Sequence, residues 1–397
     1  MYKGIRRIDF EEIFMNFAAA IAGAVIGIIA GLLPGFHTNL LAILIAGFHF
    51  DVWFSAIMLA SLAVSRSVID AVPTVFLGAS ENVMALLPGH RLLRKGCGVE
   101  AVKFCVLGSI LGIIVCITLI PLFLIAFPLL YSFIKPWLFW ILLLLIVILF
   151  VREWNLWALV VFLLSGFLGI IALDSAREPL FPLLSGLFGA SGLLYSLLSR
   201  VEIPVQVDTD VLRMRKIPLT ISVMTGVLAG SIVTLFPGLG PSQAAALAQV
   251  KKTKSLGYLV LVGALGTADV VISLVTFFVL GKARNGAVVV TEQLIGSLSP
   301  SALWYLSFVA IFAAGLAAIV ALFASRWYAR LIEFVDYSWL SLTVLIVLFI
   351  MSLILSGWLG LLIFITATAI GLVAPLTKIS RSHSMGCLLL PTLILIW

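Results

Sequence analysis

A duplicated motif constrains this chain more than any other feature. The sequence GAVIGIIAGLLPGFHTNLLA begins at Gly23, and a related sequence, GVLAGSIVTLFPGLGPSQAAA, begins at Gly226. A shift of 203 residues (237 − 34) places Pro34-Gly35 on Pro237-Gly238. Without a gap it also pairs Gly27 with Gly230, Leu44 with Leu247, Leu62 with Leu265, Val68 with Val271, Leu77 with Leu280, Gly78 with Gly281 and Asn82 with Asn285. Two apolar halves interrupted by a helix breaker at the same place are typical of a transporter that binds its substrate between repeats.

The composition assigns the chain to a membrane. Its mean hydropathy is +1.27 and only 10% of its residues are charged, whereas soluble domains carry about 25% charged residues. Several continuous apolar runs approach or exceed the roughly 20 residues that a helix needs to cross a bilayer. They are Phe17–Leu33, Phe104–Tyr131, Pro136–Val151, Leu156–Leu173, Trp304–Ala324 and Trp339–Leu355. Barrel strands would instead alternate over about 10 residues, so the sequence predicts an all-α polytopic protein of the cell membrane.

The net charge of +7 does not indicate a nucleic-acid partner. The basic residues stand in short loops beside apolar segments, where they set the orientation of a membrane protein. These residues are Arg91, Arg94, Lys95, Lys103, Lys251, Lys252, Lys254, Arg326 and Arg330. The four cysteines form no CxxC pair and no metal-ligand spacing, so neither a metal site nor a cofactor is predicted.

The chain divides into two transmembrane repeats, residues 1–199 and 217–397. Residues 200–216 (RVEIPVQVDTDVLRMRK) are the longest polar stretch, with charges on both sides of Ile203-Pro204, which is typical of a surface linker. The amino-terminal sequence precedes an apolar segment that holds half of the repeated motif. Because cleavage of a signal peptide would remove that motif, we expect this segment to be retained.

Loop charges predict inverted topologies for the two repeats. The loop after the first motif has Asp51 and no basic residue, whereas the equivalent loop of the second half has lysines at 251, 252 and 254. The next loop reverses this pattern: it has basic residues at 91, 94, 95 and 103 in the first half, and only Glu292 within residues 286–300 of the second. Basic loops remain in the cytoplasm. Equivalent loops are therefore expected on opposite faces, with broken or re-entrant helices between them.

An inverted repeat requires an odd number of crossings in each half. With a cytoplasmic amino terminus, the predicted crossings of the first half are residues 13–50, 52–80, 104–130, 137–151 and 155–173. Residues 180–198, which are rich in glycine and proline, are then re-entrant. The second half repeats this arrangement and ends with residues 384–397.

The two Pro-Gly breaks are the predicted substrate site. Proline cannot donate a backbone hydrogen bond and glycine relaxes the backbone, so each helix is expected to end there. Thr38-Asn39 and Pro241-Ser242 then suit the start of a new helix, whose free N–H groups and positive dipole end favour an anion. The substrate-binding residues predicted at the breaks are Pro34, Gly35, His37, Thr38, Asn39, Pro237, Gly238, Gly240, Ser242 and Gln243. In the alternative interpretation, each Pro-Gly pair is a kink with packing glycines around it.

The histidines differ in their predicted roles. His37 lies inside the first break, and Gly240 stands at its equivalent position in the second. His37 either donates to an anion or titrates near neutral pH, or it is an ordinary hydrogen-bonding loop residue. His90 is expected in a cytoplasmic loop, and His49 and His383 at the membrane interface.

Three ionisable residues lie within apolar segments, where charge is costly and often functional. Arg66, which the shift of 203 places on Asp269, is a candidate for binding a carboxylate or phosphate in a bidentate manner. Asp70 and Asp269 are candidates for binding a coupling sodium ion or proton. Alternatively, Arg66 and Asp70 stand four residues apart on one helix and neutralise each other.

No motif of a soluble enzyme occurs in the chain. It has no G-x-S-x-G elbow, P-loop, H-E-x-x-H or dinucleotide fingerprint, so we do not expect an enzyme. Without a P-loop, transport must draw on the gradient of a coupling ion or of the ligand itself. The sequence therefore predicts a secondary transporter of a small organic anion, such as a di- or tricarboxylate.

The motifs GIIAGLLPGFHTN, LFPGLGPSQAAALA and LPGHRLLRKGCGVEAV resemble those of the large membrane subunit of tripartite tricarboxylate transporters, in the shorter, archaeal-type branch. The resemblance covers nearly the whole chain. It implies an organic-anion transporter with two inverted repeats, whose substrate loops are Pro34–Asn39 and Pro237–Gln243. It also implies two partners, a small membrane subunit and an extracytoplasmic binding protein.

A second hypothesis is a translocase of a polyprenyl-phosphate lipid, because the chain also resembles some prokaryotic carriers of such lipids, which pair two re-entrant repeats that contain Pro-Gly. The anion site would be the same, but a lateral opening toward the lipid would replace a closed, water-lined pocket. A membrane scaffold or an intramembrane protease has less support. For a protease, Asp70 and Asp269 are the one candidate pair, and neither stands in a proteolytic motif.

Overall fold

The computed structural model describes residues 10–33, 38–76, 89, 91–175, 179–198, 204–208, 214–236, 244–245, 248, 255–334 and 337–396. Within these residues the secondary structure is helical and includes no strand. In the same residues, eight segments are long and apolar enough to cross a membrane: Glu11–Leu32, Val52–Phe76, Gly98–Thr118, Ile120–Val151, Leu156–Ser175, Leu256–Leu280, Pro300–Ile332 and Ser341–Leu376. The predicted all-α, multi-pass membrane protein is confirmed.

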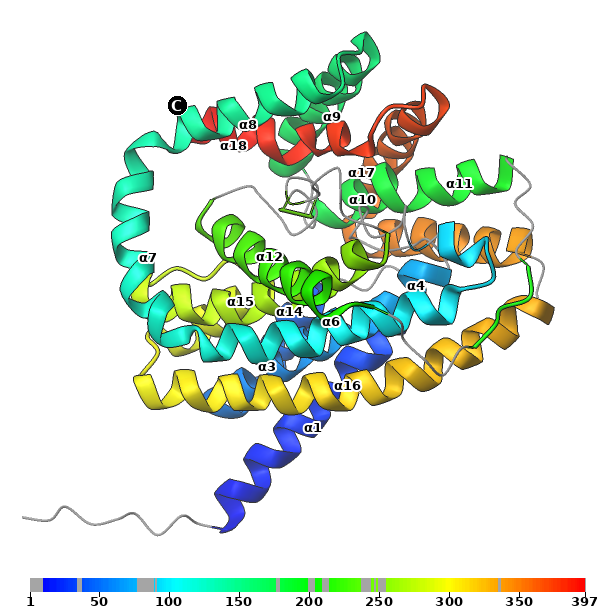
Figure 1. Ribbon diagram of the computed structural model, residues 1–397. Helices are drawn as coiled ribbons and strands as arrows, with labels where there is room; N and C mark the ends of the chain where they lie inside the picture. The colour runs from blue at the N-terminus through cyan, green and yellow to red at the C-terminus, as the bar shows by residue number, and fades with distance from the viewer. Residues whose placement is uncertain are drawn as a thin grey trace, which may run out of the picture.

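The helices of both halves are shown in chain order in Figure 1. The first half contains α1 (Phe10–Leu32), α2 (Thr38–Gly47), α3 (Val52–Ile69), α4 (Ala71–Phe76), α6 (Gly98–Thr118), α7 (Ile120–Ile134), the 3-10 turn η1 (Lys135–Trp137), α8 (Leu138–Arg152), α9 (Leu156–Ser175), α10 (Leu180–Leu184), the π-helical η2 (Ser185–Ala190) and α11 (Ser191–Leu198). The second half contains α12 (Lys216–Leu235), α14 (Ser255–Leu280), α15 (Gly286–Ile295), α16 (Pro300–Phe334), α17 (Tyr337–Leu376), the 3-10 helix η3 (Arg381–Met385) and α18 (Gly386–Ile396).

Local sequence explains where some of these helices begin and end. Asp51 caps α3, because its carboxylate accepts two backbone N–H groups of the first turn at 2.9 and 3.2 Å. α6 ends at Thr118, since Pro121 in the first turn of α7 has no N–H to donate to the carbonyl of Ile117. The predicted crossing 104–130 is therefore wrong in its bounds, because it joins parts of two helices.

The helix bounds of the second half follow those of the first after the shift of 203 residues. α12 then corresponds to α1, α14 to α3 with α4, α16 to α6 with most of α7, and α17 to α8 with α9. Within α17, Gly357 has φ 67° and ψ −163°, and it divides the helix at the position equivalent to the turn between α8 and α9. Glycine adopts this left-handed φ at little cost.

The first two long helices of each half pack through glycines in the same register. In α1 the glycines face the backbone of α3, and in α12 they face that of α14. The equivalent contacts are Gly23 with Met58, Gly27 with Leu62, Gly226 with Leu261 and Gly230 with Leu265. Small residues at this four-residue spacing let membrane helices approach closely.

The two halves interlock rather than forming separate domains. α6 of the first half packs along α14 of the second, and α3 packs along α16; the shift of 203 converts one contact into the other. The ring centroids of Trp53 and Tyr305 are 5.6 Å apart, and those of Phe76 and Tyr328 are 6.0 Å apart. α3 and α4 therefore run parallel to α16.

α3 with α4 runs antiparallel to α14. In the last turn of α3, the hydroxyl of Ser67 lies against Gly266. Further along the chain, Val75 of α4 meets Leu259, an earlier residue of α14, where both lie beside Gly89. The helices that correspond after the shift of 203 thus point in opposite directions where they cross.

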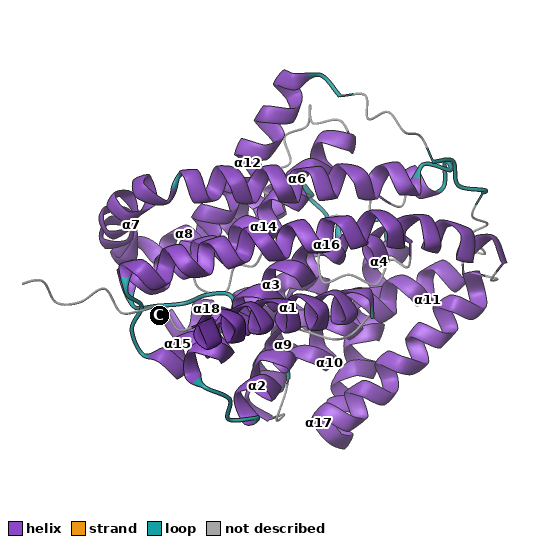
Figure 2. Cartoon of the chain, turned by 90° about the horizontal axis from the view of Figure 1, so that it is seen from below, coloured by secondary structure: helices purple, strands orange, loops and turns teal. Residues whose placement is uncertain are grey.

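The helices form two bodies, each with its own apolar core (Figure 1). The first body contains α1 to α4, α6, α12, α14, α15 and α16, and the second contains α8 to α11, α17 and α18. In the described part of the chain, no helix of one body packs along a helix of the other. α7 connects them along the left edge of Figure 1. In the first body, α6, α16 and α1 lie side by side (Figure 2).

One described part of the linker, residues 204–208, joins α6 to α16. Asp208 accepts hydrogen bonds from Nζ of Lys103 at 2.6 Å and from Nε of Arg326 at 2.8 Å. The hydrogen bond from Lys103 is the main cause that lowers the pKa of the Asp208 carboxyl, and Arg326 adds to it. The beginning of α6 and the last third of α16 therefore lie at the same end of the first body.

Candidate functional site

The Pro-Gly breaks lie outside the described residues, but helices on both sides of them are described. The predicted site residues in the breaks are Pro34, Gly35, His37, Pro237, Gly238, Gly240, Ser242 and Gln243. The structure describes the backbone of Asn39, in the first turn of α2, but not its side chain. Four predicted residues are described with their side chains: Thr38, Arg66, Asp70 and Asp269.

Arg66 reaches the helix that follows the first break. It lies in the last turn of α3, and its Nη1 donates to Oγ1 of Thr38, the first residue of α2, at 3.2 Å. Both side chains are partly buried. A cation beside a helix N-terminus is opposed by the helix dipole. An anion bound between the guanidinium and the first N–H groups of α2 would neutralise the charge of Arg66 and accept hydrogen bonds from those N–H groups.

Asp269 connects the helix before the second break to the start of α15. Its Oδ2 accepts a hydrogen bond from Nδ2 of Asn285 at 2.9 Å. Thr234, in the last turn of α12, lies beside it, and its hydroxyl donates to the carbonyl of Gly230 at 2.7 Å. The side-chain oxygen of Asn285 accepts the N–H of Ala287 at 3.2 Å and so caps α15. Because α15 packs against α2 and α3, this network reaches the helices that carry Thr38 and Arg66.

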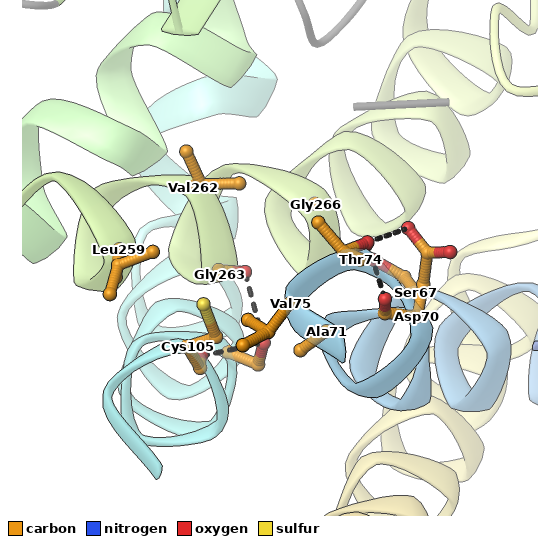
Figure 3. A pocket seen from close by; sticks show the side chains of 11 residues that line it. Ser67, Asp70, Ala71, Thr74, Val75, Cys105, Leu259, Val262, Gly263 and Gly266 are labelled. Carbon is orange, nitrogen blue, oxygen red and sulfur yellow. Dashed lines mark hydrogen bonds between the residues drawn. The ribbon is translucent and has the colours of Figure 1, made fainter. Parts of the chain in front are cut away.

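Asp70 lines a small cavity between α3, α4, α6 and α14 (Figure 3). The cavity has about 380 Å³ of empty volume, including its open side, and is lined by Ser67, Asp70, Ala71, Thr74, Val75, Cys105, Ser109, Leu259, Val262, Gly263 and Gly266. The Thr74 hydroxyl donates to the backbone carbonyl of Asp70 at 2.5 Å and lies 3.5 Å from Asp70 Oδ2. A carboxylate among hydroxyl groups is a suitable set of oxygen donors for a small cation or a proton. The local pairing of Arg66 with Asp70 stays a prediction.

Arg66 and Asp269 occupy equivalent positions on two crossing helices. Ser67 lies against Gly266, so the crossing of α3 and α14 is within one helical turn of both charged residues. Arg66 contacts the residue that follows the first break, and Asp269 lies beside Thr234, which precedes the second. The described surroundings of the two breaks therefore hold a guanidinium beside the first and a carboxyl group beside the second.

The loop between α14 and α15 holds a further set of charges. Its Ala283 N–H donates to Oε2 of Glu292 at 2.7 Å, and Nζ of Lys282 lies 6.0 Å from the ring centroid of Tyr131 on α7. Burial lowers the pKa of the Arg284 guanidinium, while the charges of Tyr131 and Glu292 act in the other direction. This loop therefore adjoins α7, the link between the two bodies.

Sequence reasoning missed the polar side chains that hold these charged residues. The repeat pairs Asn285 with Asn82, but its bond to Asp269 depends on how the loop after α14 folds back. Thr74 follows Asp70 by four residues, and this helical spacing would have predicted contact between the two side chains. Nothing in the local sequence of Ser67 or Ser109 shows that both hydroxyl-bearing residues line one cavity.

Comparisons with known proteins agree with the motif resemblance. The model of the tripartite tricarboxylate transporter TctA family matches residues 17–386, almost the whole chain. An uncharacterized protein of Methanocaldococcus jannaschii is 26% identical over 404 residues, which cover 96% of this chain and 98% of that protein. No solved structure matches the chain. The chain therefore belongs to the tripartite tricarboxylate transporter TctA family, as a multi-pass protein of the cell membrane.

Proposed function

We propose that this chain is the membrane subunit of a secondary transporter that binds a small organic anion, such as a di- or tricarboxylate, between its two broken helices. The hydrogen bond of 3.2 Å between Arg66 and Thr38 carries the proposal. It puts a guanidinium at the N-terminus of the helix that follows the first break, where an anion would be held by both groups. The family assignment agrees with a carboxylate substrate.

The transporter in this proposal consists of two inverted repeats, residues 1–199 and 217–397. α3 with α4 corresponds to α14 and runs antiparallel to it, as inverted repeats require. The corresponding helices α6 and α16 support the same arrangement. Lys103, near the start of α6, shares Asp208 with Arg326, although the shift of 203 places Lys103 on Leu306 near the other end of α16.

Alternating access in this proposal is a movement of the first body relative to the second. Arg66, Asp70 and Asp269 all belong to the first body. Its described helices pack extensively with one another but not along those of the second body. Two rigid units joined by a connecting helix are a common basis of conformational switching. The residues around the site can then move together without breaking a packed core.

The remaining parts of the proposal are the coupling ion and the partners. Asp70, in its hydroxyl-lined cavity, or Asp269, in its hydrogen-bond network, binds a sodium ion or a proton. A small membrane subunit and an extracytoplasmic binding protein complete the transporter, as the tripartite family description implies. Neither the described residues nor the family match favours the lipid-translocase hypothesis, which serves as an outcome of the test.

A thermal-shift screen of the purified chain tests this proposal. Di- and tricarboxylates, inorganic phosphate and polyprenyl phosphates are compared at several pH values, with and without sodium. A ligand at about 100 times its dissociation constant stabilises a protein by about 2.7 kcal/mol. Stabilisation by a carboxylate, lost in Gly238→Ala but kept in Gly47→Ala, supports the proposal; Gly47 has open space around it. Stabilisation by polyprenyl phosphates alone contradicts it and indicates a lipid translocase.

A further inference from the structure

A group of basic residues gathers where the first body meets α7 (Figure 1). Nζ of Lys282, in the loop that follows α14, lies 6.0 Å from the ring centroid of Tyr131 on α7. Arg284 follows in the same loop, and Tyr131 lies near its guanidinium as well. Lys135 stands one helical turn beyond Tyr131, and its backbone N–H donates to the Tyr131 carbonyl. Lys135, Lys282 and Arg284 form the α7 basic cluster.

The α7 basic cluster has no matching set of carboxylates. The charge of Glu292 acts on Arg284, but one of its oxygens already accepts the N–H of Ala283 at 2.7 Å. Within the described part of the chain, the guanidinium of Arg284 forms no hydrogen bond or ion pair, although its side chain is partly buried. A partly buried cation without a partner is costly. An anion from outside the chain would therefore stabilise this cluster.

The cluster lies at the end of a membrane-crossing segment. That segment is Leu256–Leu280, and Lys282 follows it after a single glycine. Two exposed tryptophans, Trp137 and Trp140, follow Lys135 in η1 and α8. Aromatic side chains of this kind, next to basic residues at helix ends, are typical of the level of the lipid headgroups. The cluster is therefore at the depth where a lipid phosphate lies.

Orientation in the membrane does not account for this cluster. Gly108 and Gly112 of α6 lie against Val260 and Ala264 of α14, so the two helices run parallel. The loop after α14 is therefore at the opposite end of the first body from the basic residues that precede α6. Basic loops that set orientation gather on one face of the membrane, so they explain one of these two basic sets but not both.

The outer face of α7 can pack against acyl chains. The inner face packs on the first body through Phe123 and Phe127, whose stacked rings are buried. The outer face is apolar and exposed, and its large side chains are Leu122, Ile125, Leu129 and Phe133. A surface that is cationic at one level and apolar along the adjoining helix matches a lipid with a negatively charged headgroup.

We propose that the α7 basic cluster binds the phosphate of an anionic phospholipid, whose acyl chains lie along the outer face of α7. Arg284 donates to the phosphate oxygens in a bidentate manner, while Lys282 and Lys135 add positive charge. The lipid then joins the loop after α14 to the helix that connects the two bodies. Free phosphate would meet the same cations but would leave the apolar face of α7 uncovered, so competition distinguishes the two ligands.

Native mass spectrometry of the full chain in detergent tests the proposal. Phosphatidylglycerol is titrated against the wild type, and phosphatidylcholine, which has no net charge, is the comparison. Arg284→Gln is expected to weaken binding of the first phosphatidylglycerol about fivefold, the effect of one basic residue at an anionic surface. Arg284→Lys should restore part of this loss. Arg91→Gln removes an exposed arginine near the other end of the first body and should bind as the wild type does.

A photoreactive phosphatidylglycerol, with a diazirine in one acyl chain, locates the bound lipid. Cross-links are expected within residues 122–133 of α7, and they should disappear in Arg284→Gln but remain in Arg91→Gln. Excess inorganic phosphate should leave them in place. If Arg284→Gln does not fold, Lys282→Gln provides the comparison, because Lys282 is exposed and its replacement disturbs no packing.

Three results would overturn the proposal. Phosphatidylglycerol and phosphatidylcholine could bind equally well, which would show that the cations are not used. Arg284→Gln and Arg91→Gln could weaken binding to the same extent, which would reduce the effect to general attraction by net charge. Inorganic phosphate could displace the lipid and abolish the cross-links on α7, which would make the cluster a site for free anions.

Discussion

Nη1 of Arg66 donates a hydrogen bond across 3.2 Å to Oγ1 of Thr38, and this bond ties the last turn of α3 to the first residue of α2. The two residues are 28 positions apart in the chain, on opposite sides of the loop that contains Asp51. An amphipathic pattern cannot predict such a contact, because both residues interrupt apolar sequence. The bond orients a guanidinium toward the helix that follows the first break.

Replacing Thr38 tests whether this bond supports the anion site. Thr38→Val keeps the shape of the side chain but removes the acceptor, and a single hydrogen bond contributes about 1 kcal/mol. We expect carboxylate affinity to fall about fivefold, which is the equivalent of that energy, as measured by isothermal titration calorimetry. Thr38→Ser retains the hydroxyl and should bind as the wild type does. Equal affinities for Thr38→Val and the wild type would show that the bond is irrelevant to binding.

Asp269 can be tested separately from the network around it. Asp269→Asn removes the charge and keeps a side chain that can still meet Thr234 and Asn285. If Asp269 binds the coupling ion, carboxylate binding should lose its dependence on sodium or pH in this variant. Asn285→Ala removes the hydrogen bond at 2.9 Å but not the charge, so it should retain that dependence and melt at a lower temperature. An unchanged ion dependence in Asp269→Asn would shift the assignment to Asp70.

The proposed inverted topology predicts the sides from which two equivalent loops can be labelled. Lys95 precedes α6 and Ser297 precedes α16, and both are exposed. Single cysteines at these positions, introduced with Cys97→Ser because Cys97 is partly exposed, should react with a membrane-impermeant maleimide from opposite faces. The Lys95→Cys variant should react from the cytoplasmic face, because its loop is basic. Labelling of both positions from one face would contradict the inverted repeat.

Gly357 has a conformation that only glycine adopts without strain. Its φ of 67° divides α17, and an added Cβ would meet no atom within 4 Å, so any cost of Gly357→Ala comes from the backbone alone. We expect a loss of about 1–3 kcal/mol of stability, the cost of this glycine-only region of backbone conformation. Gly315 also has open space but lies within the continuous helix α16, so Gly315→Ala should be neutral or stabilising. Thermal or denaturant unfolding in detergent compares the two, and equal effects would remove the argument about Gly357.

The Asp208 link predicts a dependence on pH and salt. Asp208 bonds to Lys103 and Arg326, and these contacts, with Lys103 first, lower the pKa of its carboxyl in the folded state. A lowered pKa means that the stabilisation is complete at neutral pH and is lost as the pH falls through that value, below the usual range near 3.9. Asp208→Asn should cost about 0.2–1 kcal/mol for each exposed pair at pH 7. The difference from wild type should shrink in acid and in high salt.

A control for this prediction is Asp174→Asn, which removes another exposed carboxylate. It should leave the melting temperature nearly unchanged at every pH between 3 and 7. If Asp208→Asn and Asp174→Asn behave alike, the Asp208 contacts do not stabilise the fold.

The sequence predicts much of the helical architecture, because the repeat supplies a register. The shift of 203 pairs α1 with α12 and α3 with α14, and the glycine contacts at Gly23 and Gly226 follow the same register. Apolar periodicity cannot separate α6 from α7, since the run from Phe104 to Tyr131 is continuously apolar and only Pro121 marks the boundary. The division into two bodies depends on long-range packing, which composition does not contain.

The candidate site is only partly predictable for the same reason. Arg66, Asp70 and Asp269 stand out because charge within apolar sequence is unusual. Their partners do not stand out: Asn285 reaches Asp269 only because the loop after α14 folds back. His383, which is buried, is similar, because its hydrogen-bond partner Glu153 is 230 residues away. Polar residues in loops become informative only when tertiary structure places them beside a buried charge.

Carboxylate affinity of Arg66→Lys, compared with the wild type and Arg91→Lys, tests the central claim most directly. Arg91 lies exposed in a short helical segment before α6 and gives the same chemical change away from the proposed site. Lysine keeps the charge but cannot form the bidentate contact of a guanidinium. The account predicts at least tenfold weaker binding for Arg66→Lys with an unchanged melting temperature without ligand, and wild-type binding for Arg91→Lys. Wild-type affinity in Arg66→Lys would contradict an anion site at the first broken helix.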